Sequence, residues 1–195
     1  MKNPRRNHTR LALALVAALA SGILPAAIPA FAQEKAVAPE KNPPGDIPDN
    51  QAFVTYQSKL GFSIKVPEGW ARKETPAGAS FADKYGAVEI LLADAVEPPT
   101  IANATSGEVA DLLKNGHAVK ITAVQMATLA SGPAVQIVYT ANSEPNGVTG
   151  KQIRQESERF LIGHNGKRAV LTFSAPQGAD NADQWKLMRD SLRWQ

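Results

Sequence analysis

The sequence contains no cysteine among its 195 residues. Disulfide bonds, thiolate metal sites and cysteine nucleophiles are therefore excluded. A bacterial lipoprotein is excluded as well, because that class needs a cysteine thiol to acylate. A folded domain of this chain must depend on its hydrophobic core alone.

The chain also lacks an apolar run of the roughly 20 residues that a transmembrane helix needs. Its N-terminal apolar run extends from Leu11 to about Leu24 behind a basic start, and Ala30-Phe31-Ala32 then supplies the small-x-small pattern that signal peptidase recognises. We therefore predict a cleavable signal peptide over residues 1–32, with cleavage near Ala32, and a periplasmic or secreted mature protein. Arg5-Arg6 leaves the twin-arginine route open beside ordinary unfolded export.

The mature protein has no excess of positive charge. The whole chain has 21 Lys and Arg against 18 Asp and Glu, and its sequence pI is about 9.2. Four of the basic residues and none of the acidic ones precede Gln33, which leaves 17 basic against 18 acidic side chains. We therefore expect no nucleic acid as a partner, because the basic pI belongs to the targeting segment.

Sequence signatures of catalytic and metal sites are missing too. His117 and His164 stand beside glycine turns, without a partner at a metal-ligand spacing. Ser80 and Ser131 lie near glycines but not in a Gly-x-Ser-x-Gly turn. We expect both histidines to be solvated, and we assign no catalytic, cofactor-binding or metal-ligating residue.

Glu156 and Glu158 are the least unfavourable pair for catalysis. Two residues apart in a β-prone run, they share one side of a strand, with carboxylates about 6–7 Å apart, which could suit a glycosidase. Arg154 and Arg159 flank them, however, and the other face is also polar. We expect an exposed hairpin extension whose charges pair across strands, and a carboxylate-using exported hydrolase is the alternative.

Other candidate binding residues are aromatic or lie in loops. Trp70 and Trp185 fall on expected core faces, whereas Trp194 could lie at the surface and anchor a partner. Two long connections, residues 97–107 and 143–150, are candidates for a partner surface, because function often lies in loops.

What the chain does contain is one region of alternating apolar pattern behind a polar segment. Residues 33–50 are rich in proline and charge, and we predict a disordered spacer there. We expect residues 51–195 to form a single domain, and the chain without its signal is long enough to bury about 70% of its unfolded surface. The expected strands are 53–56, 62–66, 79–82, 87–95, 119–129, 133–141, 151–162 and 168–174.

Two helices complete the expected domain. Thr105 and Glu108 form a capping-box pattern that predicts a helix over residues 105–114, with Val109, Leu112 and Leu113 as its apolar stripe. Asp180 or Asn181 can cap a final helix whose buried stripe is Ala182, Trp185, Met188 and Leu192. Strands joined by short turns favour an α+β fold with an antiparallel twisted sheet flanked by helices.

Three stretches follow one another in a distinctive order and spacing. They are Tyr56 with Gly61-Phe62-Ser63-Ile64 and Pro67-Glu68-Gly69-Trp70, then Gly166-Lys167-Arg168 through Ala175-Pro176, then Trp185 with Asp190-Ser191-Leu192. Together they resemble the PsbP family, the extrinsic proteins of photosystem II, and its bacterial relatives with the Mog/PsbP-like α/β/α sandwich. The resemblance covers residues 53–194.

The resemblance implies a non-enzymatic domain that binds other proteins. The metal-binding positions of some plant relatives have no matching motif in this chain, so no functional residue is transferred. We expect the partner to be another periplasmic or membrane protein, and a periplasmic small-ligand carrier is the alternative.

Overall fold

The computed structural model describes residues 34–95 and 97–195, and the predicted signal peptide lies outside this range. A seven-stranded sheet is the centre of the domain, and all of its strand pairs are antiparallel. In spatial order its strands are β3 (Ala71–Thr75), β4 (Gly78–Ala82), β5 (Ala87–Asp94), β9 (Lys167–Pro176), β8 (Arg154–His164), β7 (Gly132–Asn142) and β6 (Lys120–Leu129).

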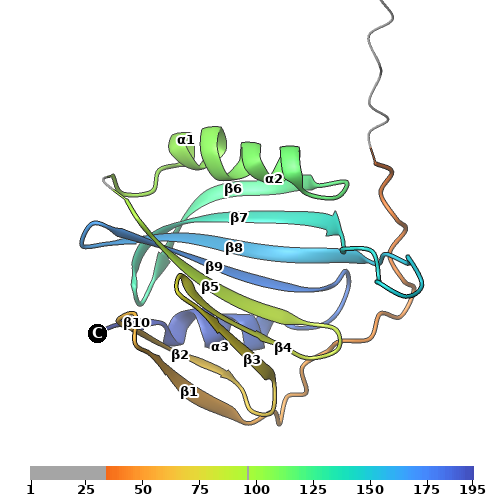
Figure 1. Cartoon of the computed structure of the whole chain (residues 1–195), viewed down its shortest axis with the longest axis horizontal. Coiled ribbons are helices and arrows are strands. Elements are labelled where there is room, and N and C mark those ends of the chain that lie inside the picture. The colour runs from red at the N-terminus through yellow and green to blue at the C-terminus, as the bar shows by residue number, and fades with distance from the viewer. Residues whose placement is uncertain (1–33, 96) are drawn as a thin grey trace, which may run out of the picture. The chain divides into compact units, whose positions relative to one another are not determined.

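A helical segment covers one face of this sheet, and a second small sheet with a helix covers the other (Figure 1). The first layer is α1 (Ile101–Ala104), a π-helical turn (Thr105–Val109) and α2 (Ala110–Asn115). The second is β1 (Phe53–Ser58), β2 (Phe62–Pro67), β10 (Arg193–Trp194) and α3 (Ala182–Ser191). This is the α+β arrangement that the sequence predicts, with its strands divided between two sheets.

Alternation along the central strands builds two cores. Val135, Ile137 and Tyr139 of β7 point to the α1–α2 side, where Ala104 and Val109 contact them. On β8 and β9, Phe160, Ile162, Leu171 and Phe173 point to the other side and pack with Trp185 and Met188 of α3. Successive side chains of a strand point to opposite faces, so a strand with period-2 apolar residues on both faces serves both cores.

The first helix begins earlier than predicted. Its N-cap is Thr100, whose side chain accepts a hydrogen bond from the Asn103 backbone, and Asn103 completes the capping box. Thr105 lies inside the helical segment, so the cap expected there is wrong. Leu113, expected in the apolar stripe, is 56% exposed, because the stripe is formed by Ala104, Val109 and Leu112 instead.

The segment 34–50 has no helix or strand, but it packs against the domain. It runs beside the domain from the β7–β8 connection to the beginning of α3 (Figure 1). Ile47 is buried in the larger core, and its backbone N–H donates to Asn181 Oδ1 at 2.7 Å. The expectation of a free spacer is therefore wrong for these residues, because side-chain amides of the domain satisfy the segment's backbone groups.

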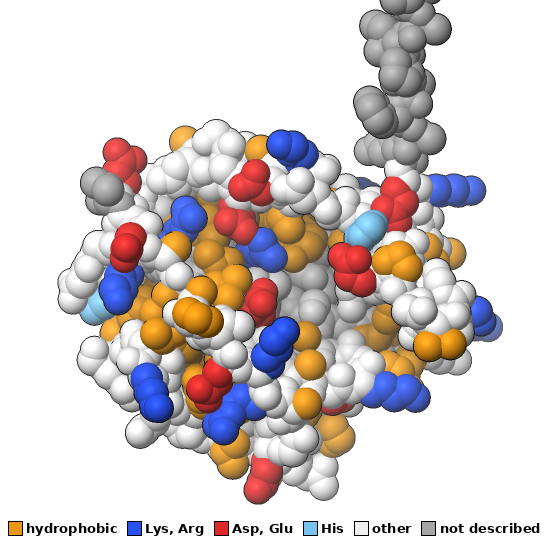
Figure 2. Space-filling view, in the orientation of Figure 1, with side chains coloured by type: hydrophobic (Ala, Val, Ile, Leu, Met, Phe, Trp, Pro, Cys, Tyr) orange, Lys and Arg blue, Asp and Glu red, His pale blue; other side chains and the backbone are white. Residues whose placement is uncertain are grey.

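Within the described residues, no helix is both long and apolar enough to cross a membrane. Basic and acidic side chains are interspersed over the face seen in Figure 2, so neither charge dominates it.

Candidate functional site

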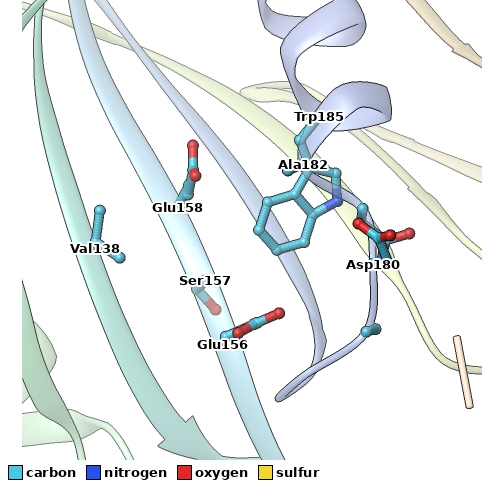
Figure 3. Close-up of a pocket in the computed structure, with 9 residues that line it drawn as sticks. Val138, Glu156, Ser157, Glu158, Asp180, Ala182 and Trp185 are labelled. Carbon is cyan, nitrogen blue, oxygen red and sulfur yellow. The ribbon is translucent and has the colours of Figure 1, made fainter. Parts of the chain in front are cut away.

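A pocket of about 180 Å³ opens between β8 and the beginning of α3 (Figure 3). Glu156 and Glu158 of β8 form one wall, and Asp180 lies across from them in the loop that precedes α3. Val138, Ala182 and Trp185 supply apolar surface. The pocket therefore combines three carboxylates with an indole ring.

Glu156 and Glu158 share one face of β8, as predicted, but they do not lie on an exposed hairpin extension. Glu156 is paired with Thr140 of β7 and Ala175 of β9, so β8 is a central strand at this point. Both side chains are half-buried, because the loop before α3 covers this face of the sheet. The hairpin interpretation is wrong, since it treated the polar end of the strand as a free edge.

The two flanking arginines bind elsewhere. Arg154 is buried and donates to the Ala118 carbonyl, Asn142 Oδ1 and Thr140 Oγ1. Arg159 forms an ion pair with Glu108 on the opposite face of the sheet, which is covered by the helical segment that contains Glu108. Neither arginine neutralises Glu156, contrary to the expected cross-strand pairing.

Glu158 is held by two donors. Arg189 Nη1 of α3 and Gln136 Nε2 of β7 both donate to Glu158 Oε2, each at 3.2 Å. The Arg189 guanidinium also lies over the Phe160 ring, 5.4 Å from its centroid. Glu158 is thereby fixed in place with one of its oxygens engaged.

Glu156 has no basic partner among the described residues. Burial raises its pKa above the ordinary value for a glutamate, and the neighbouring Glu158 charge raises it further, while the Gly178 backbone N–H partly opposes both. The two carboxylates therefore differ in environment although they belong to one strand.

Trp185 is buried, as predicted, with 6% of its surface exposed. Its ring stacks on Phe173 at a centroid distance of 5.7 Å and an interplanar angle of 21°. Its indole N–H donates to no acceptor in the described part of the chain. The residue is thus a core side chain that also lines the pocket.

The other two tryptophans differ from expectation. Trp70 packs against the larger core, on the face where it was expected, but it is only half-buried. Trp194 is also half-buried: it stacks on His164 at 4.8 Å and donates its Nε1–H to the Ser131 carbonyl at 3.2 Å. Those contacts engage Trp194 within the domain.

His117 is not a free turn residue. Its Nδ1 lies 2.7 Å from Glu34 Oε2 and its Nε2 lies 3.2 Å from Glu144 Oε2. The bond to Glu34 is the main reason why the pKa of His117 is raised. The expectation of a solvated histidine is wrong here, because it could not foresee Glu34, which lies 83 residues earlier in the chain.

The two candidate loops are built differently. Much of the segment 97–107 is helical, because α1 begins at Ile101. The segment 143–150 is a true loop, folded around hydrogen bonds to Asn146 Oδ1, with Val148 95% exposed at its tip. Among the described residues, no three His, Asp or Glu side chains are grouped in a way that could hold a metal ion.

Comparison with known proteins places the fold. No protein-family model matches the chain, and no curated protein matches its sequence. Among solved structures, cyanobacterial PsbP (CyanoP) from a Synechocystis species superposes with a TM-score of 0.53 at 12% identity, over 77% of this chain and 98% of that one.

Two other solved structures give lower scores. The Ran-binding protein Mog1p of Saccharomyces cerevisiae has a TM-score of 0.48 at 14% identity, over 73% of this chain and 95% of that one. LpqN, involved in cell envelope biogenesis of Mycobacterium tuberculosis, has a TM-score of 0.45 at 16% identity, over 74% and 91%. The likeness to CyanoP, together with the sheet and helix layers described above, shows that the domain has the PsbP-like α+β fold that its sequence motifs predict.

Proposed function

We propose that this chain is an exported, non-enzymatic binding domain that acts by contact with another protein in the periplasm or outside the cell. The observation that supports this proposal most directly is the pocket between β8 and α3, which is lined by apolar side chains and carboxylates. Its volume of about 180 Å³ is below the roughly 300–1,000 Å³ of typical small-molecule sites. A single side chain of a partner suits such a pocket better than a whole substrate does.

Export is part of the same proposal and depends on the N-terminal sequence. A basic start, an apolar run and Ala30-Phe31-Ala32 are the parts of a cleavable signal. The absence of cysteine is compatible with an oxidising compartment, where a free thiol would be exposed to oxidation.

Site-specific photo-crosslinking in cells tests the binding role. A photoreactive amino acid replaces Ala182, which was expected in the buried stripe of α3 but is exposed at the pocket. In a matched control it replaces Lys73, which is exposed on β3. We expect one reproducible protein adduct from position 182 and not from position 73. Equal adducts from both positions, or none from position 182 under several growth conditions, would contradict the proposal.

A carboxylate-using hydrolase is the second candidate. The raised pKa of Glu156 beside Glu158, which is paired with Arg189, resembles the acid and base environments of such enzymes. Against it, Arg189 and Gln136 already occupy one Glu158 oxygen, and the pocket is small. Hydrolysis of a glycoside panel that disappears in the Glu156→Gln variant would favour this candidate over a binding domain.

A further inference from the structure

We propose that the pocket between β8 and α3 binds an alkylammonium group, and that in use this group is the side chain of a lysine on a protein partner. This inference depends on the proposed binding function and adds the chemistry that the pocket recognises. Charge, shape and an unused hydrogen-bond donor each support it.

The charge of the pocket is unbalanced. Three carboxylates line it, and no lining residue is basic. Arg189 compensates Glu158 only, and Asp46 adds a fourth carboxylate close by, where its Oδ1 accepts the Asp180 backbone N–H at 2.8 Å. A cation entering the pocket would therefore meet two lining carboxylates, those of Glu156 and Asp180, that form no ion pair among the described residues.

The walls fit a cation carried on an alkyl stem. Val138, Ala182 and the Trp185 ring offer apolar surface to methylene groups, and the indole ring is the aromatic system that attracts cations most strongly. Figure 3 shows the Trp185 ring between the two glutamates of β8 and Asp180. A primary ammonium has three donors that can each bind a separate carboxylate. A planar guanidinium is better suited to binding one carboxylate through two parallel hydrogen bonds.

Trp185 gives a second, independent indication of a ligand. The side chain is more than nine-tenths buried, and its N–H meets no acceptor in the described residues, although the nitrogen atom itself keeps access to solvent. Such a donor can bind water in the free protein, and a ligand that displaces the water has to offer an acceptor in its place. A carbonyl oxygen of a peptide that places its lysine in the pocket would supply the missing acceptor.

The position of Glu156 also favours a binding role over a structural one. Burial and the charge of the neighbouring Glu158 raise the pKa of Glu156, although the Gly178 backbone N–H opposes them. Groups whose pKa is perturbed in this way concentrate at functional sites. A bound ammonium would stabilise the ionised form of Glu156 and remove the repulsion.

The test is a titration of the mature protein with butylammonium chloride. Binding is monitored by the NMR signal of the Trp185 indole N–H. We expect a saturable shift with butylammonium, and no saturable shift with 1-pentanol, a neutral molecule of similar size, or with added sodium chloride. Glu156→Gln should weaken binding by about ten-fold or more, since it removes a charged hydrogen-bond partner. Glu74→Gln, which removes an equal charge on the exposed strand β3, should leave the affinity unchanged.

Three results would overturn the assignment. They are no saturable shift with butylammonium, equal weakening in both glutamine variants, and equal affinity for butylguanidinium. These results would overturn the assigned ligand but not the binding function. A protein partner could still bind at the pocket and give a crosslinked adduct at position 182.

A second arm separates a protein lysine from a free amine. An acetylated, amidated Gly-Lys-Gly peptide should bind at least as tightly as butylammonium, and the same peptide with acetyl-lysine should not bind. A lysine peptide that binds more weakly than butylammonium would overturn the protein source and favour a small-amine carrier.

Discussion

The His117 ring lies between two carboxylates, that of Glu34 in the N-terminal segment and that of Glu144 in the β7–β8 connection. Glu34 accepts from Asn142 Nδ2, Gln152 Nε2 and the His117 ring, and these contacts lower the pKa of Glu34. In return, Glu34 raises the pKa of His117. The raised histidine pKa stabilises the contact below about pH 6.5, and this stabilisation is lost as pH rises through the pKa of the folded state. The lowered pKa of Glu34 stabilises the contact above about pH 4.5, and this stabilisation is lost as pH falls through the pKa of the folded state. The contact is therefore strongest between about pH 4.5 and 6.5.

A titration of His117 by NMR measures this link. We expect its pKa to lie above 6.5 in the native protein and to fall in Glu34→Gln. Glu144→Gln serves as the control and should lower the pKa less, because Glu144 is more distant from the ring and 86% exposed. A larger effect from Glu144→Gln would show that Glu34 does not hold the ring.

Glu156 should reduce the stability of the free protein at neutral pH. Its pKa is raised, so its folded-state preference for the neutral form adds stability below the unfolded pKa and is lost as pH rises through the folded pKa. Glu156→Gln should therefore increase the free energy of unfolding at pH 7 by up to about 1 kcal/mol, a modest gain because the side chain is half-exposed. Urea unfolding at pH 7 and pH 4 checks it, and the gain should vanish at pH 4.

At the scale of elements, the segment 34–50 matters for stability through one side chain. Ile47 belongs to the larger core, and its backbone is held by Asn181. Ile47→Ala should lower the free energy of unfolding by about 2–4 kcal/mol, as is usual for such truncations in a core. Val148→Ala, at a fully exposed loop position, should change it by less than about 0.5 kcal/mol. Equal urea midpoints for these two variants would contradict the packing of the segment.

The terminal helix should be indispensable. Deleting residues 177–195 removes Trp185, Met188 and Leu192, which are all buried. Each contributes about 1.5–3 kcal/mol when buried, and their sum approaches the roughly 5–15 kcal/mol stability of a whole domain. We expect no cooperative thermal transition by circular dichroism, whereas a cooperative melt would show that the sheet is stable without α3.

Local patterns predicted the elements wherever alternation or a turn residue was strong. The four strands β6 to β9 were found within about three residues, because glycine turns and period-2 apolar residues mark them. β3 was missed, since all five of its residues are exposed and none alternates. Thr105 is followed by a glutamate three residues later, as the capping-box pattern requires, whereas Thr100 forms its capping box with Asn103, which that pattern does not include.

The pocket could be predicted only in part. The spacing of Glu156 and Glu158 placed them on one face correctly, because that depends on strand geometry alone. Their burial depends on the loop at Asp180 folding over β8, which no local pattern records. Glu34 at His117 was missed for the same reason, since 83 residues separate the two.

At the scale of the whole domain, a pairing between strands that are distant in the sequence joins the two parts of the seven-stranded sheet. β5 pairs with β9, so that Ala87 lies opposite Ser174, while the chain between them forms the helical layer and three more strands. Folds dominated by such non-local pairings fold in about milliseconds to seconds. Stopped-flow refolding should show a main phase in that range, apart from slower proline-limited phases, and a main phase of microseconds would contradict it.

The complete exposure of β3 has a consequence for how the protein behaves in a crowded compartment. β3 is one of the two edge strands of the seven-stranded sheet, and Arg72, Lys73 and Glu74 occupy its middle. An open strand edge is a template on which a strand of another chain can add, and charged side chains discourage that addition. The same lack of apolar residues that hides β3 from sequence patterns thus protects the domain from edge-to-edge aggregation.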